Sequence, residues 1–460
     1  MSPSYDVIVI GGGSAGYAAA RTAQIEGAKV AIIDQGPLGG LCILRGCMPT
    51  KAILRSSDIA ALIRRAPEFG LNTHGMQANL SAIIDRKNRL IKEFADDRIQ
   101  SLTDSRFTLY RERAHFLSPS ELQVGHQRLS AKNIIIATGS VVARPPIKGL
   151  EDVGYLTSDE ALELSTVPET LIVLGGGPVA LELAQFFSRI GVQVTLLQRS
   201  AHVLSDSDED LADPVEARFR EEGMQVFTGT AIREVTASGP LKTVHFLHKG
   251  QPQQATASTI LQALGRRPNI DDLHLEAARL SPQNGKIVVT STMQTSQSHI
   301  YAVGDVNGLH EIVHIAIEQG EIAGWNATHP LEFPKRFDER LKAQVVFTDP
   351  QVASVGLSEK ECTKNDIPYL TASYPFNDHG KSLCLGETHG HVKVLCDPQT
   401  GEILGGHIVG PEASEVIHEL ITVMYFKGTV RDLFRIPHYH PTLTEILTYP
   451  AEELTKQLPD

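Results

Sequence analysis

The chain has 460 residues, of which 42% are hydrophobic and 21% are charged, and its formal net charge at pH 7 is −12. Nucleic acids and anionic membranes bind basic surfaces, so this charge argues against either as a broad partner. Five cysteines in so long a chain do not indicate a secreted disulfide scaffold. No apolar run is long enough to span a membrane, and no basic region of a secretory signal precedes residue 7. We expect a cytoplasmic protein of about three domains.

A dinucleotide-binding pattern follows the apolar run at residues 7–10. It has the form G-x-G-x-x-G and stands between this expected strand and an alanine-rich expected helix. Gly11 permits a tight turn, Gly13 lets the backbone approach a pyrophosphate, and Gly16 allows the helix to pack closely on the strand. The next expected strand ends at Asp34, where a carboxylate can bind a ribose hydroxyl.

Cys42 and Cys47 lie five positions apart, between a glycine pair and Pro49. Five residues of regular helix rise about 7.5 Å and turn the side chains apart, whereas a disulfide needs Cα atoms within roughly 7 Å. A bond between the two cysteines therefore requires a bend between them. Pro49 suits a first helical turn, which would place Cys47 at the positive end of a helix expected to run to Arg65 and would favour its thiolate. The spacing favours a redox pair over two unrelated buried cysteines, but by itself it establishes no bridge.

The glycine pattern recurs in the middle of the chain as G-x-G-x-x-A. Gly175, Gly177 and Ala180 again follow an apolar run and precede an expected helix. Two such units predict two nucleotide cofactors, one of which passes electrons to the other.

The strand after this second pattern ends differently from the first. It leads into Gln198 and Arg199, with no carboxylate to bind a ribose 2′-hydroxyl. This favours slightly the acceptance of NADP(H), although Arg199 could equally be an ordinary surface residue. The acidic residues at 206–210 could repel a phosphate; we interpret them instead as a solvated helix start.

Two later regions carry further signals. A buried strand at residues 133–136 ends in the small-residue turn of Thr138 and Gly139, which can approach a cofactor closely. Residues 345–347, 391–395 and 404–409 are expected to form an antiparallel sheet, covered by helices around 415–426 and 443–456.

A histidine and a glutamate near the C-terminus suggest a base. Pro441 suits the first turn of a helix that would carry Glu445, and an imidazole oriented by a carboxylate can deprotonate a thiol near neutral pH. The alternatives are that His440 only caps a helix, or that His438 and His440 bind a metal. No further ligand lies at a suitable spacing, so we predict no metal site.

In their order along the chain these motifs resemble those of the FAD-dependent pyridine-nucleotide disulfide oxidoreductases, which include dihydrolipoamide dehydrogenase, glutathione reductase and mercuric reductase. The resemblance runs from about Tyr5 to Leu454. Its further markers are Glu182, Gly265–Asn269, Tyr301–Asp305, Phe347–Pro350 and His440–Glu445.

The resemblance implies an α/β fold of two Rossmann-like domains and a C-terminal α+β dimerisation domain. Residues 1–148 and 265–335 would bind FAD and carry the redox disulfide, residues 149–264 would bind NAD(P)(H), and residues 336–460 would form the homodimer interface. It implies catalytic roles for Cys42, Cys47, His440, Glu445, Lys51 and Glu182. The FAD residues would be Gly11, Gly13, Gly16, Asp34, Lys51, Thr138, Gly139 and Asp305. The NAD(P) residues would be Gly175, Gly177, Ala180, Gln198, Arg199 and Gly265.

The implied activity is electron exchange between a dithiol/disulfide and NAD(P), with oxidation of a protein-bound dihydrolipoyl group as the first expectation. The alternatives are a glutathione-type or mercuric-type reductase and, from another class, a flavin-bearing redox sensor or assembly partner. The sequence around residues 175–200 resembles mercuric reductase more, whereas the C-terminal end lacks a further cysteine pair, which argues against that role. Leu44 and Arg45 stand where the family usually has Asn and an apolar residue, so the substrate stays open.

Overall fold

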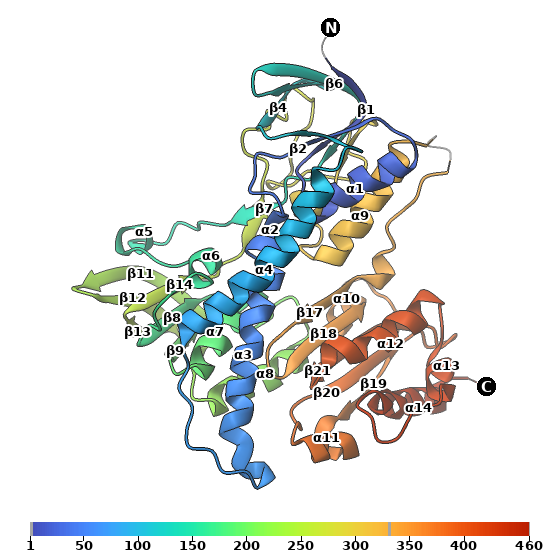
Figure 1. The fold of residues 1–460 in the computed structure, drawn as a ribbon. Coiled ribbons are helices and arrows are strands. Elements are labelled where there is room, and N and C mark those ends of the chain that lie inside the picture. The colour runs from blue at the N-terminus through green and yellow to red at the C-terminus, as the bar shows by residue number, and fades with distance from the viewer. Residues whose placement is uncertain (1–2, 330–332, 460) are drawn as a thin grey trace. The chain divides into compact units, whose positions relative to one another are not determined.

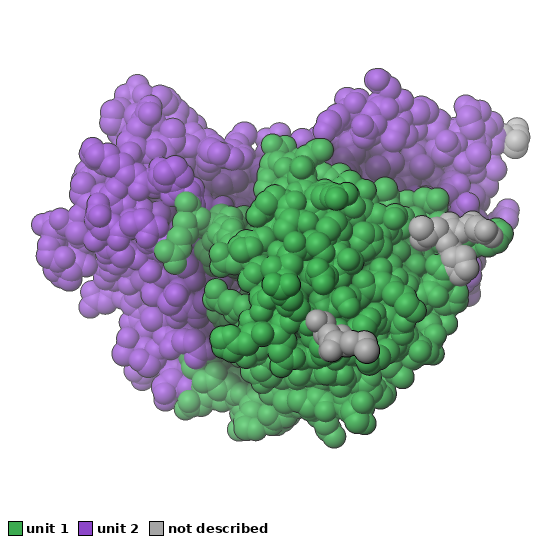
Figure 2. Space-filling model, turned by 90° about the horizontal axis from the view of Figure 1, so that it is seen from above, with its two compact units in different colours: residues 1–52, 82–144, 265–338 green, residues 53–81, 145–264, 339–460 purple. Residues whose placement is uncertain are grey.

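The structure is a computed structural model that describes residues 3–329 and 333–459. It divides into two compact units (Figure 2). The first comprises residues 1–52, 82–144 and 265–338, and the second comprises residues 53–81, 145–264 and 339–460. None of the described helices is both long and apolar enough to cross a membrane.

The first unit is built on a seven-stranded sheet in the order β3-β2-β1-β6-β5-β4, with β16 also paired to β6. Its parallel strands are β1 (Ser4–Ile10), β2 (Val30–Ile33), β3 (Thr108–Tyr110), β6 (Gln127–Ile136) and β16 (Ile300–Ala302). Strands β4 (Ala114–Ser118) and β5 (Glu121–Val124) extend it in antiparallel fashion. Val7, Ile8 and Val9 are fully buried, because strand β1 has neighbours on both sides and layers on both faces.

Two helices of this unit, α1 (Ser14–Ile25) and α9 (Val313–Asn326), lie side by side (Figure 1). A Cβ atom at Gly320 would lie only 2.3 Å from the backbone oxygen of Ala15. One at Gly324 would lie 2.5 Å from that of Ala19. The two glycines of α9, four residues apart, therefore let the helix backbones approach closely, and each of them contacts an alanine of α1.

This unit also contains elements outside the sheet. They are α2 (Gly40–Leu44), the first residues of α3 (Cys47–Arg65), most of α4 (Leu80–Leu102), the paired strands β7 (Ser140–Val142) and β15 (Arg266–Pro268), and the 3₁₀ turn η2 (Gly304–Asn307). Ligands of open parallel sheets bind at the carboxyl ends of the strands, so the carboxyl edge of the sheet is where a nucleotide site is expected.

The second unit repeats this plan on a smaller scale. Its four-stranded parallel sheet has the order β10-β9-β8-β14. The strands are β8 (Thr170–Leu174), β9 (Gln193–Leu197), β10 (Gln225–Phe227) and β14 (Thr259–Gln262), accompanied by α7 (Pro178–Arg189) and α8 (Glu209–Glu221). An antiparallel sheet of β11 (Thr230–Ser238), β12 (Leu241–His248) and β13 (Gln251–Ala257) packs beside it, and Ile172, Val244 and Phe246 share one hydrophobic cluster.

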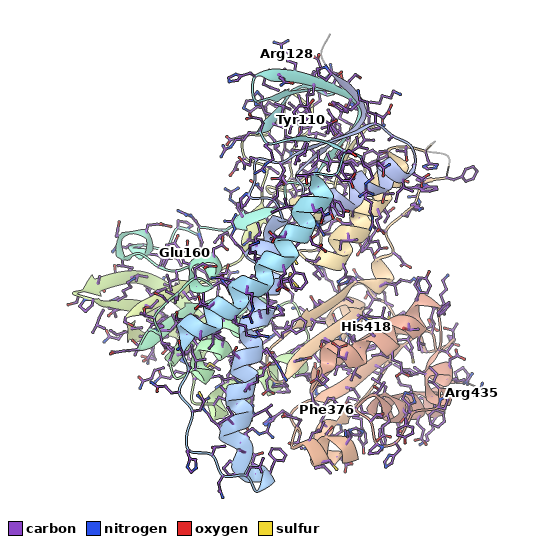
Figure 3. The ribbon with its side chains drawn as sticks, viewed as in Figure 1. Tyr110, Arg128, Glu160, Phe376, His418 and Arg435 are labelled. Carbon is purple, nitrogen blue, oxygen red and sulfur yellow. The ribbon has the colours of Figure 1, made fainter. Side chains whose placement is uncertain are left out.

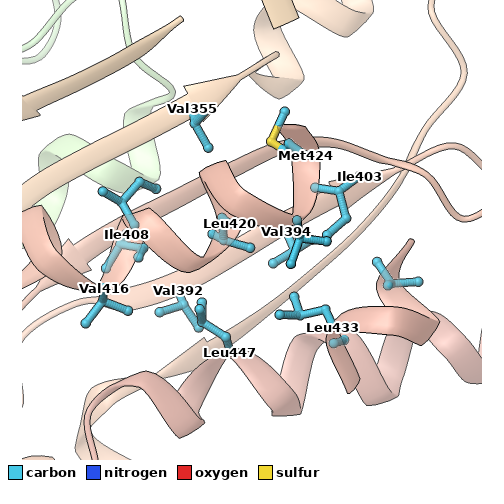
Figure 4. Packing of buried hydrophobic residues seen from close by; sticks show 14 of the residues in the cluster. Val355, Val392, Val394, Ile403, Ile408, Val416, Leu420, Met424, Leu433 and Leu447 are labelled. Carbon is cyan, nitrogen blue, oxygen red and sulfur yellow. The ribbon is translucent and has the colours of Figure 1, made fainter. Parts of the chain in front are cut away.

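The C-terminal part of this unit is a five-stranded antiparallel sheet in the order β17-β18-β21-β20-β19. Its strands are β17 (Ala343–Val346), β18 (Gln351–Gly356), β19 (Leu370–Pro375), β20 (His391–Cys396) and β21 (Ile403–Gly410). Its helices are α10 (Glu359–Lys364), α11 (Gly380–Leu385), α12 (Ala413–Tyr425), α13 (Val430–Arg435) and α14 (Thr448–Gln457), and its short turns include η4 (Phe376–Asp378) and η5 (Thr444–Leu447). Figure 4 shows Leu420 of α12 and Leu447 of η5 packed with Val392 and Val394 of β20.

The expected α/β class, the two strand–glycine–helix units and the C-terminal sheet are confirmed. The expected helix at Pro441 is wrong. Residues 440–443 are not helical, and the first helical turn is η5, which starts at Thr444. Leu443 packs against the hydrophobic cluster of the C-terminal sheet, and the helical turn begins only after this contact.

Candidate active site

The two cysteines lie in a helix–bend–helix. Cys42 lies in α2, which ends at Leu44, and Cys47 is the first residue of α3. Between them, Gly46 lies so close to Cys42 that a Cβ on Gly46 would be 3.2 Å from the Cys42 Cα. The predicted bend is therefore present, and a side chain at position 46 would crowd the backbone of Leu41 and Cys42.

The two cysteine side chains meet. Cys42 is a thiol that forms a hydrogen bond with the Cys47 side chain, and this bond, followed by burial, raises the pKa of Cys42. The positive charge of Lys51, one helical turn beyond Cys47, acts in the opposite direction with less weight on the same pKa. Negative charge in the pair is therefore favoured on Cys47, which also lies at the amino-terminal end of α3.

The start of the cysteine loop is packed against the first glycine motif. Gly39 and Gly40 have φ angles of 133° and 76°, which only glycine adopts without strain. A Cβ on Gly40 would lie 2.7 Å from the Cα of Gly13, and one on Gly39 would lie 3.1 Å from the Leu44 side chain. The cysteine pair and the expected pyrophosphate loop are thus neighbours in one unit.

The first glycine motif is close-packed at its ends. A Cβ on Gly16 would lie 1.8 Å from the backbone oxygen of Gly11, so no side chain fits there. Asp34 follows β2, and its two carboxylate oxygens accept the backbone N–H groups of Gly12 and Gly36, each at 2.7 Å. Each oxygen retains a further lone pair, so the carboxylate can also accept a ribose hydroxyl.

Three motifs that are far apart in sequence meet in this unit. The Thr138 hydroxyl donates to the backbone oxygen of Asn269 at 2.7 Å. The next residues continue the contact, since the Ser140 hydroxyl donates to Asp305 Oδ2 at 2.6 Å, and Arg266 Nε donates to Ser140 Oγ at 2.8 Å. Ser140 was not singled out from the sequence; its place directly after the Thr138–Gly139 turn was the only signal.

The second glycine motif has a more open end. A Cβ on Gly175 would lie 2.3 Å from the backbone oxygen of Ala263, whereas one on Gly177 would meet no described atom within 4 Å. Gln198 is buried at the end of β9 and Arg199 is exposed. Gly265 lies in the other compact unit, where its backbone oxygen accepts the N–H of Ala143 at 3.0 Å.

The C-terminal histidine and glutamate are in contact. His440 Nδ1 lies 3.0 Å from Glu445 Oε2, and the His440 side chain is 79% exposed while that of Glu445 is 12% exposed. Glu445 is held by the turn η5 and His440 reaches into solvent. His438 does not join His440, because its Nε2 lies 2.8 Å from Glu419 Oε1. Over residues 3–329 and 333–459 no group of three or more His, Cys, Asp or Glu side chains could hold a metal ion.

Comparison with known proteins decides the family. Residues 5–320 match the pyridine nucleotide-disulphide oxidoreductase family, and residues 342–451 match its dimerisation domain. The chain belongs to this family. It is 35% identical to a mercuric reductase from Staphylococcus aureus, over 93% of this chain and 78% of that protein. It is also 35% identical to a dihydrolipoyl dehydrogenase from Thermus scotoductus, over 99% of this chain and 98% of that protein.

A solved structure shares the fold. The Cu(II) complex of the HOCl-induced flavoprotein disulfide reductase RclA from Escherichia coli superposes with a TM-score of 0.86 at 25% identity, covering 98% of this chain and all of that one. Members of the family are enzymes that use FAD and NAD(P)H, so the expected oxidoreductase activity and cofactors are confirmed at this level. The dimerisation domain supports a homodimer.

The residues at the first glycine motif fit FAD. Helix α1 begins at Ser14 without a side-chain cap from any described residue, which leaves backbone N–H groups for a phosphate. The Arg98 guanidinium lies 4.5 Å above the Tyr17 ring, and its buried Nη1 has no hydrogen-bond partner in the described part of the chain. A buried cationic donor without a partner beside an uncapped helix start suits an anionic ligand.

The acidic run at 206–210 differs from its predicted role. Asp208 is the N-cap of α8 but it is buried rather than solvated. The buried Lys393 Nζ lies 2.8 Å from both Asp208 and Asp210 and 3.0 Å from Glu359. The expected helix start is confirmed, and Asp206 and Glu209 are exposed. The expected solvation is wrong for Asp208, because Lys393, 185 residues away in sequence, pairs with it in the interior.

Glu182 lies on a polar face of α7. Its Oε1 accepts the backbone N–H of Phe347 at 2.9 Å, and Gln185, one turn later, exchanges hydrogen bonds with the backbone of Asp349. Two turns after Glu182, the buried Arg189 pairs with the Asp349 carboxylate. The ion pair of Glu182 with Lys51 stays a prediction, since Lys51 belongs to the other compact unit.

Proposed function

We propose that this enzyme oxidises a dihydrolipoyl group, carried on a protein, to its disulfide with NAD(P)+ as the electron acceptor. The observation that supports the substrate class is the contact between His440 and Glu445. A thiol must lose a proton before it attacks a disulfide, so a thiol substrate needs a base, whereas a metal ion brings no proton to remove. A base therefore favours dithiol chemistry over the mercuric-type alternative.

The proposed exchange uses four side chains. The partner subunit's His440, oriented by the carboxylate of the partner subunit's Glu445, takes the proton of the first substrate thiol. The thiolate attacks Cys42 Sγ in the oxidised pair, the Cys42–Cys47 bond breaks, and Cys47 leaves as a thiolate. The sulfur of the second substrate thiol then attacks the substrate sulfur of the mixed disulfide, its proton passes to Cys42 Sγ, and Cys42 leaves as a thiol. The substrate is oxidised by two electrons and the cysteine pair is reduced by two.

The raised pKa of Cys42 suits this order. Once the pair is reduced, the hydrogen bond from Cys42 to Cys47 keeps negative charge on Cys47, at the start of α3. The chemistry that FAD supplies when bound is two-electron transfer between this dithiol and NAD(P)+. Gly11, Gly13, Asp34, Thr138 and Asp305 would hold it, and Ser140 and Arg266 would orient Asp305.

For the nicotinamide cofactor we propose that NADP(H) is accepted. Gln198 stands at the end of β9 in place of a carboxylate, and Arg199 is exposed beside it, with no ion pair found within residues 3–329 and 333–459. Because Asp208 and Asp210 face Lys393, their charges are compensated and weigh less against a 2′-phosphate. Gly175, Gly177 and Ala180 would hold the pyrophosphate.

Two other functions are alternatives that the assay described below separates from this one. A mercuric-type or glutathione-type reductase is favoured by the 35% identity to a mercuric reductase. A redox sensor with little turnover would use the same cofactor but would not need the cysteine pair for NAD(P)H oxidation.

The test is a steady-state assay of the purified holoenzyme with dihydrolipoamide and NAD+, dihydrolipoamide and NADP+, glutathione disulfide and NADPH, and Hg(II) and NADPH. We expect turnover of dihydrolipoamide that Cys42→Ser and His440→Gln abolish and that Cys384→Ser, at an exposed cysteine, leaves unchanged. Activity with Hg(II) alone would favour the reductase, and no turnover of any thiol or disulfide would favour the sensor.

A further inference from the structure

A second histidine contacts the carboxylate that orients His440. His379 is fully buried between η4 and α11, and its Nε2 lies 3.3 Å from Glu445 Oε1. The other carboxylate oxygen, Oε2, faces His440 at 3.0 Å. On its far side, His379 Nδ1 lies 2.9 Å from the hydroxyl of Ser382, which is also fully buried. Four side chains thus form one line from solvent to the interior.

The chemistry of the two ends assigns the protons. An ionised carboxylate has no proton to share, so we place the ring proton of neutral His379 on Nε2, which faces Glu445 Oε1 at 3.3 Å in an electrostatic contact without hydrogen-bond geometry. Burial lowers the pKa of His379, which keeps the ring neutral near pH 7, although Glu445 acts in the opposite direction. Nδ1 of a neutral ring is an acceptor, and the Ser382 hydroxyl therefore donates to it. This arrangement fixes one tautomer and one orientation of the ring.

The surroundings of His379 are aromatic and carry little charge. The ring edges meet Phe376, labelled in Figure 3, at a centroid distance of 6.4 Å, and Tyr449 of α14 at 6.5 Å. Tyr374 of β19 stacks on Tyr449 and bonds to Asp378. The charged or titratable groups that act on His379 are Glu445 from η5 and His440 from the loop before it.

We propose that His379 is a positioning residue for the His440–Glu445 pair and that Ser382 fixes the His379 ring. The proposal rests on the function proposed above, in which His440 is the base. With His440 at one carboxylate oxygen and His379 at the other, Glu445 is restrained from rotating away from His440. The Nε2–H dipole also interacts with part of the carboxylate charge and so weakens the effect of that charge on His440.

The test compares His379→Leu, His379→Gln and Ser382→Ala in the holoenzyme. His379→Gln keeps an N–H donor in reach of Glu445, and His407→Gln is the matched control, because His407 is also a buried histidine of this domain but bonds to the backbone oxygen of Leu357. Two rates are followed, namely kcat/KM for dihydrolipoamide against pH and the reduction of the flavin by NADPH, which needs no thiol base.

For His379→Leu we expect kcat/KM to fall about 10-fold, in the range found when a ligand-orienting partner is lost. The acidic limb of the pH profile should move to higher pH by about half a unit, since the full carboxylate charge then stabilises protonated His440. In Ser382→Ala, kcat/KM for dihydrolipoamide should fall about threefold. His379→Gln should recover most of the loss, and flavin reduction by NADPH and the His407→Gln control should stay at wild-type values.

A wild-type pH profile in His379→Leu or, should that variant not fold, a wild-type kcat/KM in Ser382→Ala would overturn the proposal. So would an equal loss in His379→Gln and His379→Leu, because the effect would then be structural. These results leave the proposed function intact as long as His440→Gln abolishes dithiol turnover. Wild-type turnover by His440→Gln would instead remove the proposed function itself.

Discussion

The two glycine motifs of this chain share one plan and differ at three points of contact. Both follow a buried parallel strand, and both precede a twelve-residue helix whose N-cap is a glycine. The first allows no Cβ at Gly16, whereas in the second the Cβ of Ala180 lies 3.7 Å from the position of a Cβ on Gly175. The helix of the first unit therefore approaches its turn more closely, and the closer turn is also the one that receives the cysteine loop at Gly40.

The ribose ends differ in charge and in support. Asp34 accepts hydrogen bonds from the backbone N–H groups of Gly12 and Gly36, which hold its carboxylate in place. Gln198 occupies the matching place, and its Oε1 accepts the backbone N–H of Arg199 at 3.0 Å. The first unit thus presents a fixed carboxylate, and the second presents a neutral amide followed by a cation.

The outer faces of the two helices also differ. Helix α1 packs on α9 through small residues by backbone and van der Waals contacts, and the ion pair between them, Arg21 with Glu321, is exposed. Helix α7 presents Glu182, Gln185 and Arg189 to the segment at 347–349 through hydrogen bonds and ion pairs. The first unit is consequently sensitive to added volume and the second to lost charge, and the following substitutions separate these two sensitivities.

The largest expected effect is on the charged face of α7. Arg189 is 2% exposed and pairs with Glu222 at 2.6 Å, with Asp58 at 3.1 Å and with Asp349. Arg189→Leu would leave these carboxylates without their buried partner, and we expect a loss of about 3–5 kcal/mol in the free energy of unfolding, measured by urea denaturation. Arg21→Leu, on the exposed face of α1, should change it by less than about 1 kcal/mol. Equal losses would contradict the comparison.

The next effect concerns volume. Gly16→Ala would place a methyl group 1.8 Å from a backbone oxygen. We expect the free energy of unfolding to fall by about 2–3 kcal/mol and the purified protein to be depleted of FAD. Ala180→Gly only removes a methyl group. It should lower the free energy of unfolding by about 1 kcal/mol, because glycine is a poorer helix former than alanine, and it should not cause loss of FAD. Urea denaturation measures the free energy of unfolding of each variant, and the FAD-to-protein absorbance ratio measures its FAD content. Full FAD content in Gly16→Ala would show that the two turns are equally open.

The smallest effect concerns the choice of nicotinamide. Gln198→Asp would place in the second unit the carboxylate that the first unit has at Asp34. We expect the ratio of kcat/KM for NADP+ over NAD+ to fall about 10-fold, because a carboxylate repels a 2′-phosphate and accepts a 2′-hydroxyl. Thr195→Ser, on the same strand, serves as the control. An unchanged ratio would mean that Gln198 does not face the ribose.

Local rules made much of this structure predictable. The glycine spacings fixed the two nucleotide units, and the fixed rise of a helix required the bend that Gly46 provides between Cys42 and Cys47. Long-range partners were not predictable. Nothing near Asp208 in sequence points to Lys393, and nothing near Glu445 points to His379, since single buried histidines and lysines carry no spacing pattern. Pro441 misled because tertiary packing of Leu443, rather than local propensity, sets where the helical turn begins.

The central claim is that electrons pass from the substrate to the flavin through Cys42 and Cys47. Anaerobic mixing of the holoenzyme with dihydrolipoamide, followed by flavin absorbance, tests it most directly. We expect the wild-type flavin and that of the Cys384→Ser control to be bleached by the dithiol. The flavin of Cys42→Ser should be bleached by NADPH but not by the dithiol. Bleaching of Cys42→Ser by dihydrolipoamide at the wild-type rate would contradict the account.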